Sequence, residues 1–255
     1  PVTCVAATTL SGVDMLLKEM ELLLPTSSEN DSLCAEDENG DICEIKCNDE
    51  NPLCAKVFKT SIDPYIGKMS YVKVLSGSIK TGMNIACAET GEKEKIGKII
   101  TLRGKEQIDV DKISCGDIGV IIKSNAQTNS TICQPEKILK YSDIIFPKGY
   151  YHMAVKSVKQ GDESKISSAI SKILDEDKTL SFETNTTTNE QILSGLGEQH
   201  LASVAYKLKE LYNTDVELKN PKVAYKETIR KKAKVQGKHK KQSGGHGQYG
   251  DVWIE

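Results

Sequence analysis

Short apolar runs separated by turn signals fill the stretch between about Leu53 and Pro135, and they constrain the fold more than any other feature of the sequence. Apolar and polar residues alternate within these runs, as they do in strands with one buried face. Because no segment with a helical period lies between them, they predict a small closed β-barrel at residues 53–140. The runs are 55–58, 70–75, 83–87, 96–100 and 118–122, and the turns are 63–64, 76–78, 80–82, 90–91 and 115–117.

The apolar period changes after the barrel, in residues 141–221. Two stretches have a helical period, one beginning at Asp162 as an N-cap and one carrying Leu201, Val204, Leu208 and Leu211 on one face. Strands are expected at 151–158, 179–184, 190–194 and 215–218. This βαββαβ order predicts a ferredoxin-like domain, and the chain as a whole is predicted to be a multidomain α+β protein.

Charge is segregated along the chain, although the net charge of −2 gives the whole molecule no field that would attract nucleic acid or membrane. Residues 29–51 hold nine Asp and Glu against the single Lys46, which predicts an acidic linker at 29–52. Residues 226–241 hold eight Lys and Arg against the single Glu227. This basic segment opens a further unit at 222–255.

Residues 1–28 predict a strand end followed by one helix, which Pro25 stops. These two elements cannot build a core of their own, so we expect the chain to be a fragment of a larger protein. The opening residues match neither a signal peptide nor a membrane span, and we expect a cytoplasmic protein.

Eight cysteines in a chain of this size, without secretory features, indicate reduced thiols. Cys34, Cys43, Cys47 and Cys54 form one cluster, but they lack the C-x2-C spacing and the nearby histidine of a zinc site. Buried or incidental thiols are the favoured interpretation, with structural zinc as the alternative. His200, on a helix with an apolar stripe, is likewise more typical of a structural histidine than of a catalytic base or ligand.

Gly245, Gly247 and Gly250 have the spacing G-x-G-x-x-G of a dinucleotide-binding turn. That turn requires a hydrophobic strand before the glycines and a helix after them, because the pyrophosphate lies at the helix N-terminus. Here a run of lysines precedes the glycines, and a strand with Val252 and Ile254 is expected after them. A nucleotide-dependent enzyme therefore remains only as an alternative, beside a solvated basic hairpin and an RNA-binding loop.

Five ordered stretches of the chain are similar to elongation factor G and its close paralogues, the ribosomal translocases. They lie at 57–68 and 75–82 in the barrel, at 194–201 and 221–229 around the ferredoxin-like domain, and at 241–250 in the glycine-rich loop. The resemblance implies that residues 1–28 end a GTPase domain and that residues 222–255 begin a fourth domain whose tip is the glycine-rich loop.

The resemblance further implies that the parent protein is a GTPase that uses GTP and Mg²⁺. This chain contains no G-x-x-x-x-G-K-[ST] phosphate loop, so we expect it to bind no cofactor and to be catalytically inactive alone. Ala6 and Ala7 stand where the family lines its guanine pocket.

The resemblance implies a monomeric translation factor, without membrane contact, that binds the ribosome and promotes movement of tRNA and mRNA. Its partners would be the ribosome, ribosomal RNA and the tRNA–mRNA duplex at the decoding centre. A ribosomal protection factor or a specialised translocase paralogue is the alternative within translation. Glycines allow close approach of backbone to RNA, and lysines contact phosphates. The predicted RNA-binding residues are Lys238, Lys240, Lys241, Gln242, Ser243, Gly244, Gly245 and His246.

Overall fold

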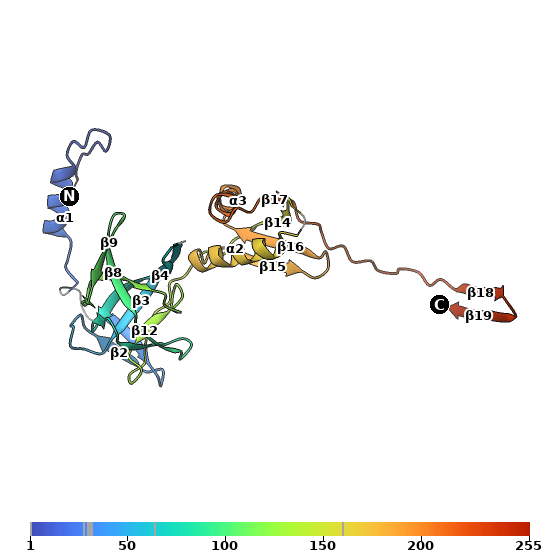
Figure 1. Cartoon of the computed structure of the whole chain (residues 1–255), viewed down its shortest axis with the longest axis horizontal. Helices are drawn as coiled ribbons and strands as arrows, with labels where there is room; N and C mark the ends of the chain where they lie inside the picture. The colour runs from blue at the N-terminus through green and yellow to red at the C-terminus, as the bar shows by residue number, and fades with distance from the viewer. Residues whose placement is uncertain (1, 28, 30–32, 64, 160) are drawn as a thin grey trace.

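The computed structural model of the chain describes residues 2–27, 29, 33–63, 65–159 and 161–255. Pro64 of the predicted turn at 63–64 and Asp31 of the acidic segment lie outside the described residues. A β-rich domain, a domain with two helices on a sheet, and a C-terminal hairpin follow one another along the chain (Figure 1). The hairpin lies at the far end of an extended segment.

The first domain is built around an eight-stranded antiparallel sheet with the order β7-β6-β12-β3-β4-β11-β8-β9. Its interior is a core of aliphatic side chains such as Leu53, Val72, Ile79, Ile99 and Ile132, all nearly inaccessible to solvent. The strands are β3 (Cys54–Asp63), β4 (Gly67–Ser76), β6 (Asn84–Cys87), β7 (Lys93–Lys95), β8 (Lys98–Arg103), β9 (Glu106–Val110), β11 (Ile118–Ile122) and β12 (Thr131–Cys133).

The sheet curls around its core but does not close through hydrogen bonds between its two end strands. Among the described residues, β7 pairs only with β6, and β9 pairs only with β8. The two short strands β5 (Ile79–Lys80) and β10 (Lys112–Ile113) form a separate pair beside it. The predicted multidomain α+β fold class is confirmed, and the antiparallel barrel is present as a curled sheet; only its closure by hydrogen bonds, also expected, is not found among the strands that the structure describes.

The acidic segment predicted as a linker folds instead into part of the β-rich domain. It forms β1 (Leu33–Asp37) and β2 (Ile42–Ile45), and β1 also pairs with β13 (Leu139–Tyr141). Alternation explains this result: Ala35 and Ile45 face inward and pack with Leu139, while Glu36 and Glu44 face outward.

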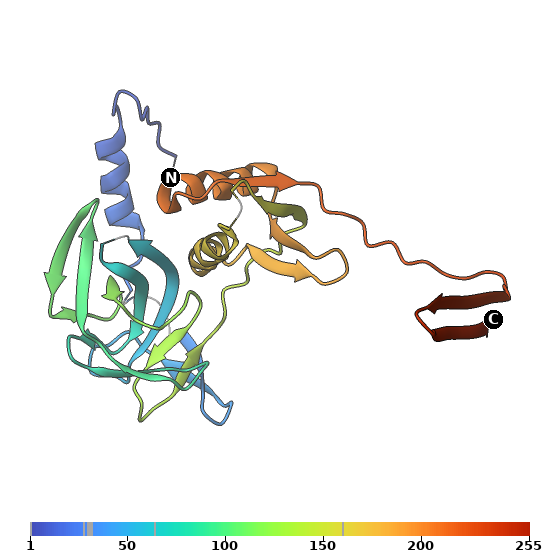
Figure 2. The same cartoon turned by 45° about the vertical axis from the view of Figure 1, so that its right-hand side comes forward.

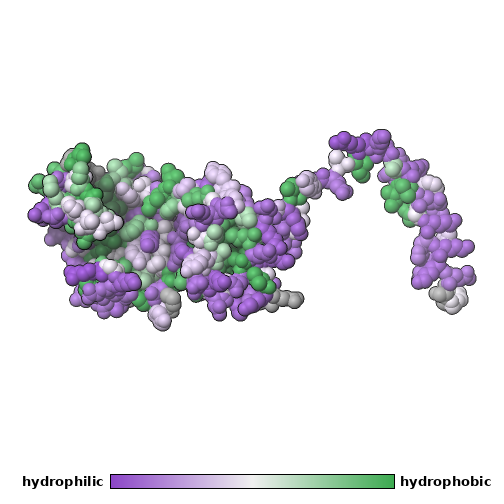
Figure 3. Space-filling view, turned by 90° about the horizontal axis from the view of Figure 1, so that it is seen from above, coloured by the Kyte–Doolittle hydropathy of each residue, from purple (hydrophilic) through white to green (hydrophobic). Residues whose placement is uncertain are grey.

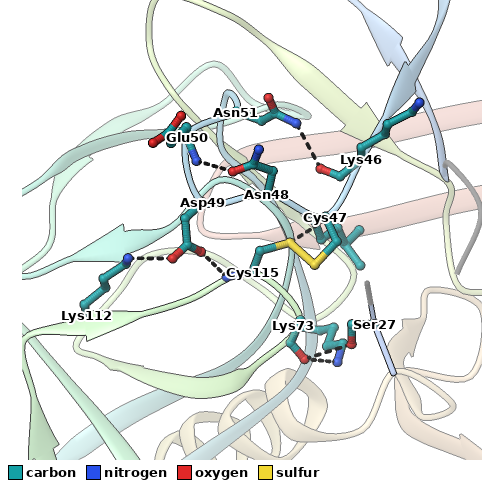
Figure 4. Close-up of a disulfide and its surroundings, with 12 residues drawn as sticks. Ser27, Lys46, Cys47, Asn48, Asp49, Glu50, Asn51, Lys73, Lys112 and Cys115 are labelled. Carbon is teal, nitrogen blue, oxygen red and sulfur yellow. Dashed lines mark hydrogen bonds and ion pairs between the residues drawn. A yellow bond between two sulfur atoms is a disulfide. The ribbon is translucent and has the colours of Figure 1, made fainter. Parts of the chain in front are cut away.

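A disulfide between Cys47 and Cys115 ties this acidic segment to the turn that precedes β11 of the eight-stranded sheet (Figure 4). The two residues are 68 positions apart in sequence, and their Cα atoms are 5.5 Å apart. Next to it, Asp49 accepts hydrogen bonds from Lys112 Nζ at 2.6 Å and from the Cys115 backbone N–H at 2.7 Å. Both hydrogen bonds lower the pKa of the Asp49 carboxyl, and the one from Lys112 has the larger effect. The prediction of reduced thiols is wrong for Cys47 and Cys115.

The remaining cysteines in the described part of the chain are free. Burial raises the pKa of the Cys54 thiol to about 12. The described residues contain no group of three or more His, Cys, Asp or Glu side chains that could hold a metal ion.

The second domain has the predicted βαββαβ order, with the antiparallel sheet order β15-β16-β14-β17. Ile166, Ile170 and Ile173 of the first helix pack with Leu201 and Leu208 of the second. Leu211, predicted on the buried stripe, is 60% exposed, and Tyr212 in the same turn packs against the core instead. The elements are β14 (Tyr151–Ser157), α2 (Glu163–Glu176), β15 (Ser181–Asn185), β16 (Glu190–Gly195), α3 (Glu198–Tyr212) and β17 (Val216–Lys219).

The C-terminal end of α2 contacts strand β3 of the first domain, and Figure 2 shows α2 between the curled sheet and the four-stranded sheet. The Ile62 backbone N–H donates a 2.8 Å hydrogen bond to Glu176 Oε1. Lys178 Nζ donates a longer bond, 3.4 Å, to Gln127 Oε1. The two domains are therefore joined by polar contacts at one end of α2.

At the N-terminal end, α1 (Val13–Leu23) has no buried residue in this chain. Its apolar side chains, including Met20 and Leu23, are about half exposed. No helix in the described ranges is both long enough and apolar enough to cross a membrane.

Candidate nucleic-acid interface

The candidate site is the hairpin of β18 (Val235–Ser243) and β19 (His246–Ile254), which follows a segment without helix or strand at 220–234. The two strands pair in register from Val235 opposite Ile254 to Ser243 opposite His246. Residues directly opposite one another share a face of the hairpin, so this register assigns each described side chain of the two strands to one of two faces.

Gly244 and Gly245 form the two-residue turn, with φ angles of +65° and +87°. Positive φ at both central residues is what a type I′ hairpin turn requires, and glycine adopts it without steric strain. A Cβ added at either position would meet no heavy atom within 4 Å. The backbone conformation, and not a lack of space, therefore favours glycine at both positions. Two residues without side chains leave the tip of the hairpin narrow and open to solvent.

The glycine spacing G-x-G-x-x-G does not form a dinucleotide site. Gly247 and Gly250 lie within strand β19, which continues to Ile254, whereas a dinucleotide turn requires a helix there. The alternative of a nucleotide-dependent enzyme built on these glycines is therefore wrong.

The predicted lysines lie on both faces of the hairpin. Lys238 and Lys240 share one face with Gln242, while Lys241 lies on the opposite face. All four side chains are exposed, and the hairpin surface is largely hydrophilic (Figure 3). Lys238 Nζ lies 5.7 Å from the centre of the Tyr249 ring. The hairpin therefore presents positive charge along its length, which is the surface property needed to contact phosphates.

Ser243 and His246 pair through their backbones at the base of the turn, but their side chains lie outside what the structure describes. Lys234, Tyr249 and Trp253 are not among the predicted RNA-binding residues. Lys234 Nζ lies 5.8 Å from the centre of the Trp253 ring. The strand predicted after the glycines would have indicated the two aromatic residues, because alternation places Tyr249 and Trp253 on the same face of the strand.

Ala6 and Ala7, the predicted remnant of a guanine pocket, lie in an exposed turn. The Ala6 backbone N–H donates to the Ser11 carbonyl at 3.0 Å. The N-terminal segment before α1, which holds both alanines, lies at the opposite end of the molecule from the hairpin (Figure 1).

The contacts of His200 are those of a structural histidine. Its Nδ1 accepts a hydrogen bond from the Leu196 backbone N–H at 3.1 Å, so Nε2 carries the proton and donates to Asp177 Oδ2 at 2.9 Å. Burial opposes ionisation of Asp177, but hydrogen bonds from Thr179 and His200 outweigh it and lower the pKa of the carboxyl. His200 thus links α3 to the end of α2.

Three family models match successive parts of the chain. They are elongation factor G domain 2 at residues 52–134, domain III at 146–220, and domain IV at 221–255. The fold and these matches thus define a set of translation-factor domains.

Two relatives match over nearly the whole chain. Elongation factor G of Fervidobacterium nodosum is 34% identical over 256 aligned positions, which cover all of this chain and 37% of the relative. A crystal structure of a protein from Thermus thermophilus matches with a TM-score of 0.70 and 33% identity, over 95% of this chain and 34% of that one. The chain belongs to the elongation factor G family, and it spans little more than a third of the length of these relatives.

Proposed function

We propose that the chain acts within a longer translation factor that binds the ribosome and promotes GTP-dependent movement of tRNA and mRNA. In this proposal GTP and Mg²⁺ bind to a separate GTPase domain, because the chain has no phosphate loop. The chain itself contributes ribosome binding and the mechanical link between that domain and the RNA, and the protein works as a cytoplasmic monomer.

The observation that carries the proposal is the hairpin, which exposes Lys238, Lys240 and Gln242 behind a two-glycine tip. A tip without Cβ atoms can approach an RNA backbone closely, and the amide of Gln242 can both donate and accept hydrogen bonds in an RNA minor groove. We propose the tRNA–mRNA duplex at the decoding centre as the target of the tip, and ribosomal RNA as the target of the lysines.

The link between domains is proposed to run through the end of α2, where Glu176 accepts the Ile62 N–H and Lys178 reaches Gln127. Because these contacts are few and polar, the two domains can rotate as rigid units. We infer that a change in the GTPase domain would reach the hairpin as such a rotation.

The test is co-sedimentation of the full-length protein with ribosomes, with and without a non-hydrolysable GTP analogue. We expect nucleotide-dependent binding, and in the variant Gln242→Ala/Ser243→Ala we expect retained binding with slower mRNA movement in a toeprinting assay. Gln107→Ala, on the exposed strand β9, is the matched control and keeps full activity.

Failure of the protein to bind ribosomes in every nucleotide state would overturn the proposal. Ribosome binding without mRNA movement would instead favour the related alternative, a ribosomal protection factor or specialised paralogue.

A further inference from the structure

The two faces of the hairpin differ in chemistry. One face, here called the valine face, carries Val235, Gly237, His239, Lys241, Gln248, Gly250, Val252 and Ile254. The other, here called the tryptophan face, carries Lys234, Gln236, Lys238, Lys240, Gln242, Tyr249, Asp251 and Trp253. Trp253 is the single tryptophan of the chain.

The valine face is the one suited to pack against protein. Val235 lies opposite Ile254, and Val252 lies opposite Gly237, so three β-branched side chains form a continuous apolar area at the base of the hairpin. A two-stranded hairpin is at best marginally stable alone, and one such face normally supplies its packing. The tryptophan face then remains exposed to solvent.

Contacts on the tryptophan face support this orientation. Lys234 and Lys238 hold their ammonium groups 5.8 Å and 5.7 Å from the ring centres of Trp253 and Tyr249. A lysine over a ring keeps its charge in water, so these rings are covered by mobile cations and not by a protein core. Trp253 and Tyr249 are about as exposed as Val235, Val252 and Ile254, so the chemistry of the two faces, and not their exposure, distinguishes them.

One carboxylate interrupts the positive charge of this face. Asp251 accepts hydrogen bonds from Gln236 Nε2, at 2.8 Å and 3.1 Å to its two oxygens, and from the Tyr249 hydroxyl at 3.2 Å. These bonds hold the carboxylate within the face and orient the Tyr249 ring. Three lysines against this one acid leave the face with an excess of positive charge.

We infer that the tryptophan face binds single-stranded RNA, with unpaired bases stacking on Trp253 and Tyr249 and with Lys234, Lys238 and Lys240 contacting phosphates. Aromatic side chains in a positively charged groove or strip are the usual platform for unpaired bases. Trp253 and Tyr249 are four residues apart on one strand, roughly 14 Å at about 3.4 Å per residue, so each takes a separate base. This inference rests on the proposed function and extends it from the hairpin tip to its flank.

The test is a titration of the 255-residue chain with a single-stranded 12-nucleotide RNA of mixed sequence, followed by the fluorescence of Trp253. We expect quenching of the emission and a binding constant that falls steeply with salt. Trp253→Ala is expected to weaken binding of a labelled copy of the same RNA about 5-fold or more. Trp253→Phe keeps an aromatic ring and is expected to restore most of the affinity.

Two neighbouring lysines provide the matched control. Lys240→Ala removes charge from the tryptophan face and is expected to weaken binding more than Lys241→Ala, which removes the same charge from the valine face. Hydrogen exchange of the β18 and β19 amides is measured for each variant, and only variants with unchanged protection are compared.

Several results would overturn the inference. These are no RNA binding by the chain, RNA binding without a change in Trp253 emission, equal loss from the two lysine variants, or equal affinity for a blunt RNA duplex. If Gln242→Ala/Ser243→Ala weakened RNA binding while Trp253→Ala did not, the flank inference would fail and the proposed function of the tip would stand. Failure of the full-length protein to bind ribosomes is a separate result, and it would remove the proposed function.

Discussion

The backbone N–H of Ile62, in strand β3, donates a 2.8 Å hydrogen bond to Glu176 Oε1 in the last turn of α2. These residues are 114 positions apart and belong to different domains, so this bond is a direct polar link between the curled sheet and the ferredoxin-like domain. Glu176 Oε2 also lies 3.9 Å from Lys207 Nζ, which connects the same carboxylate to α3.

Glu176→Ala is expected to loosen this link without unfolding either domain. Hydrogen bonds to charged groups contribute about 1.5–3 kcal/mol, so the Ile62 amide is expected to exchange roughly tenfold faster or more. Native-state hydrogen exchange measures this directly. Glu210→Ala, on the exposed side of α3, serves as the control. Unchanged exchange at Ile62 would show that the bond does not hold the domains together.

The turn glycines give a second prediction. At φ +65°, valine in place of Gly244 is expected to destabilise the hairpin by about 1–2 kcal/mol, because a β-branched residue is strained in the left-handed region. Gly244→Asn is the matched variant, since asparagine tolerates this region. Amide exchange of Lys241 and Gln248, which form a hydrogen-bonded pair in this register, reports hairpin stability. Equal protection in the two variants would contradict a left-handed conformation at residue 244.

Removing the disulfide is expected to destabilise the β-rich domain. The double variant Cys47→Ser/Cys115→Ser frees a loop of 68 residues in the unfolded chain, and a disulfide of this kind typically contributes about 2–4 kcal/mol. Urea unfolding without reductant measures the change, with the exposed Cys34→Ser as the control. If the double variant and the control unfolded at the same urea concentration, the disulfide would have no stabilising role.

The pair His200 and Asp177 predicts a dependence of stability on pH. Because the folded-state pKa of Asp177 is lowered, the stabilisation is fully present above the ordinary value of 3.8 and is lost as pH falls through the lower folded value. Amide protection in α3 is therefore expected to fall steeply below about pH 4. In Asp177→Asn, amide protection in α3 is expected to depend less on pH in this range and to be reduced already at pH 7.

The control is Glu183→Gln, on the exposed edge strand β15, which is expected to show the wild-type dependence of α3 amide protection on pH. A wild-type slope in Asp177→Asn would assign the acid sensitivity to other carboxyl groups.

Local patterns in the sequence were sufficient to predict most of the fold. Alternation in residues 70–75 gave the position of β4, and the spacing of Ile166, Ile170 and Ile173 gave the buried side of α2. Both patterns are read within one element and need no knowledge of its neighbours.

The unpredicted features depend on contacts between distant residues. Strands β1 and β2 were missed because Ala35 and Ile45 stand among many acids, and their burial depends on Leu139 about a hundred positions away. The pairing of Cys47 with Cys115 depends in the same way on the folded sheet.

In the candidate site, too, some residues could be predicted from a local motif and others could not. The glycine tip and the lysines were visible as a local motif, whereas the approach of Lys234 to Trp253 depends on the strand register. A register is fixed only once the turn type and both strands are known.

The most direct test of the account is photo-crosslinking from the hairpin tip. A benzophenone amino acid at Gln242 in the full-length protein, bound to ribosomes that carry mRNA and tRNA, is predicted to crosslink to RNA at the decoding centre. The same group at Glu183 is the control and is predicted to give no such product. Crosslinks from Gln242 to ribosomal proteins alone, or the same pattern from both positions, would contradict the central claim that this hairpin tip contacts RNA.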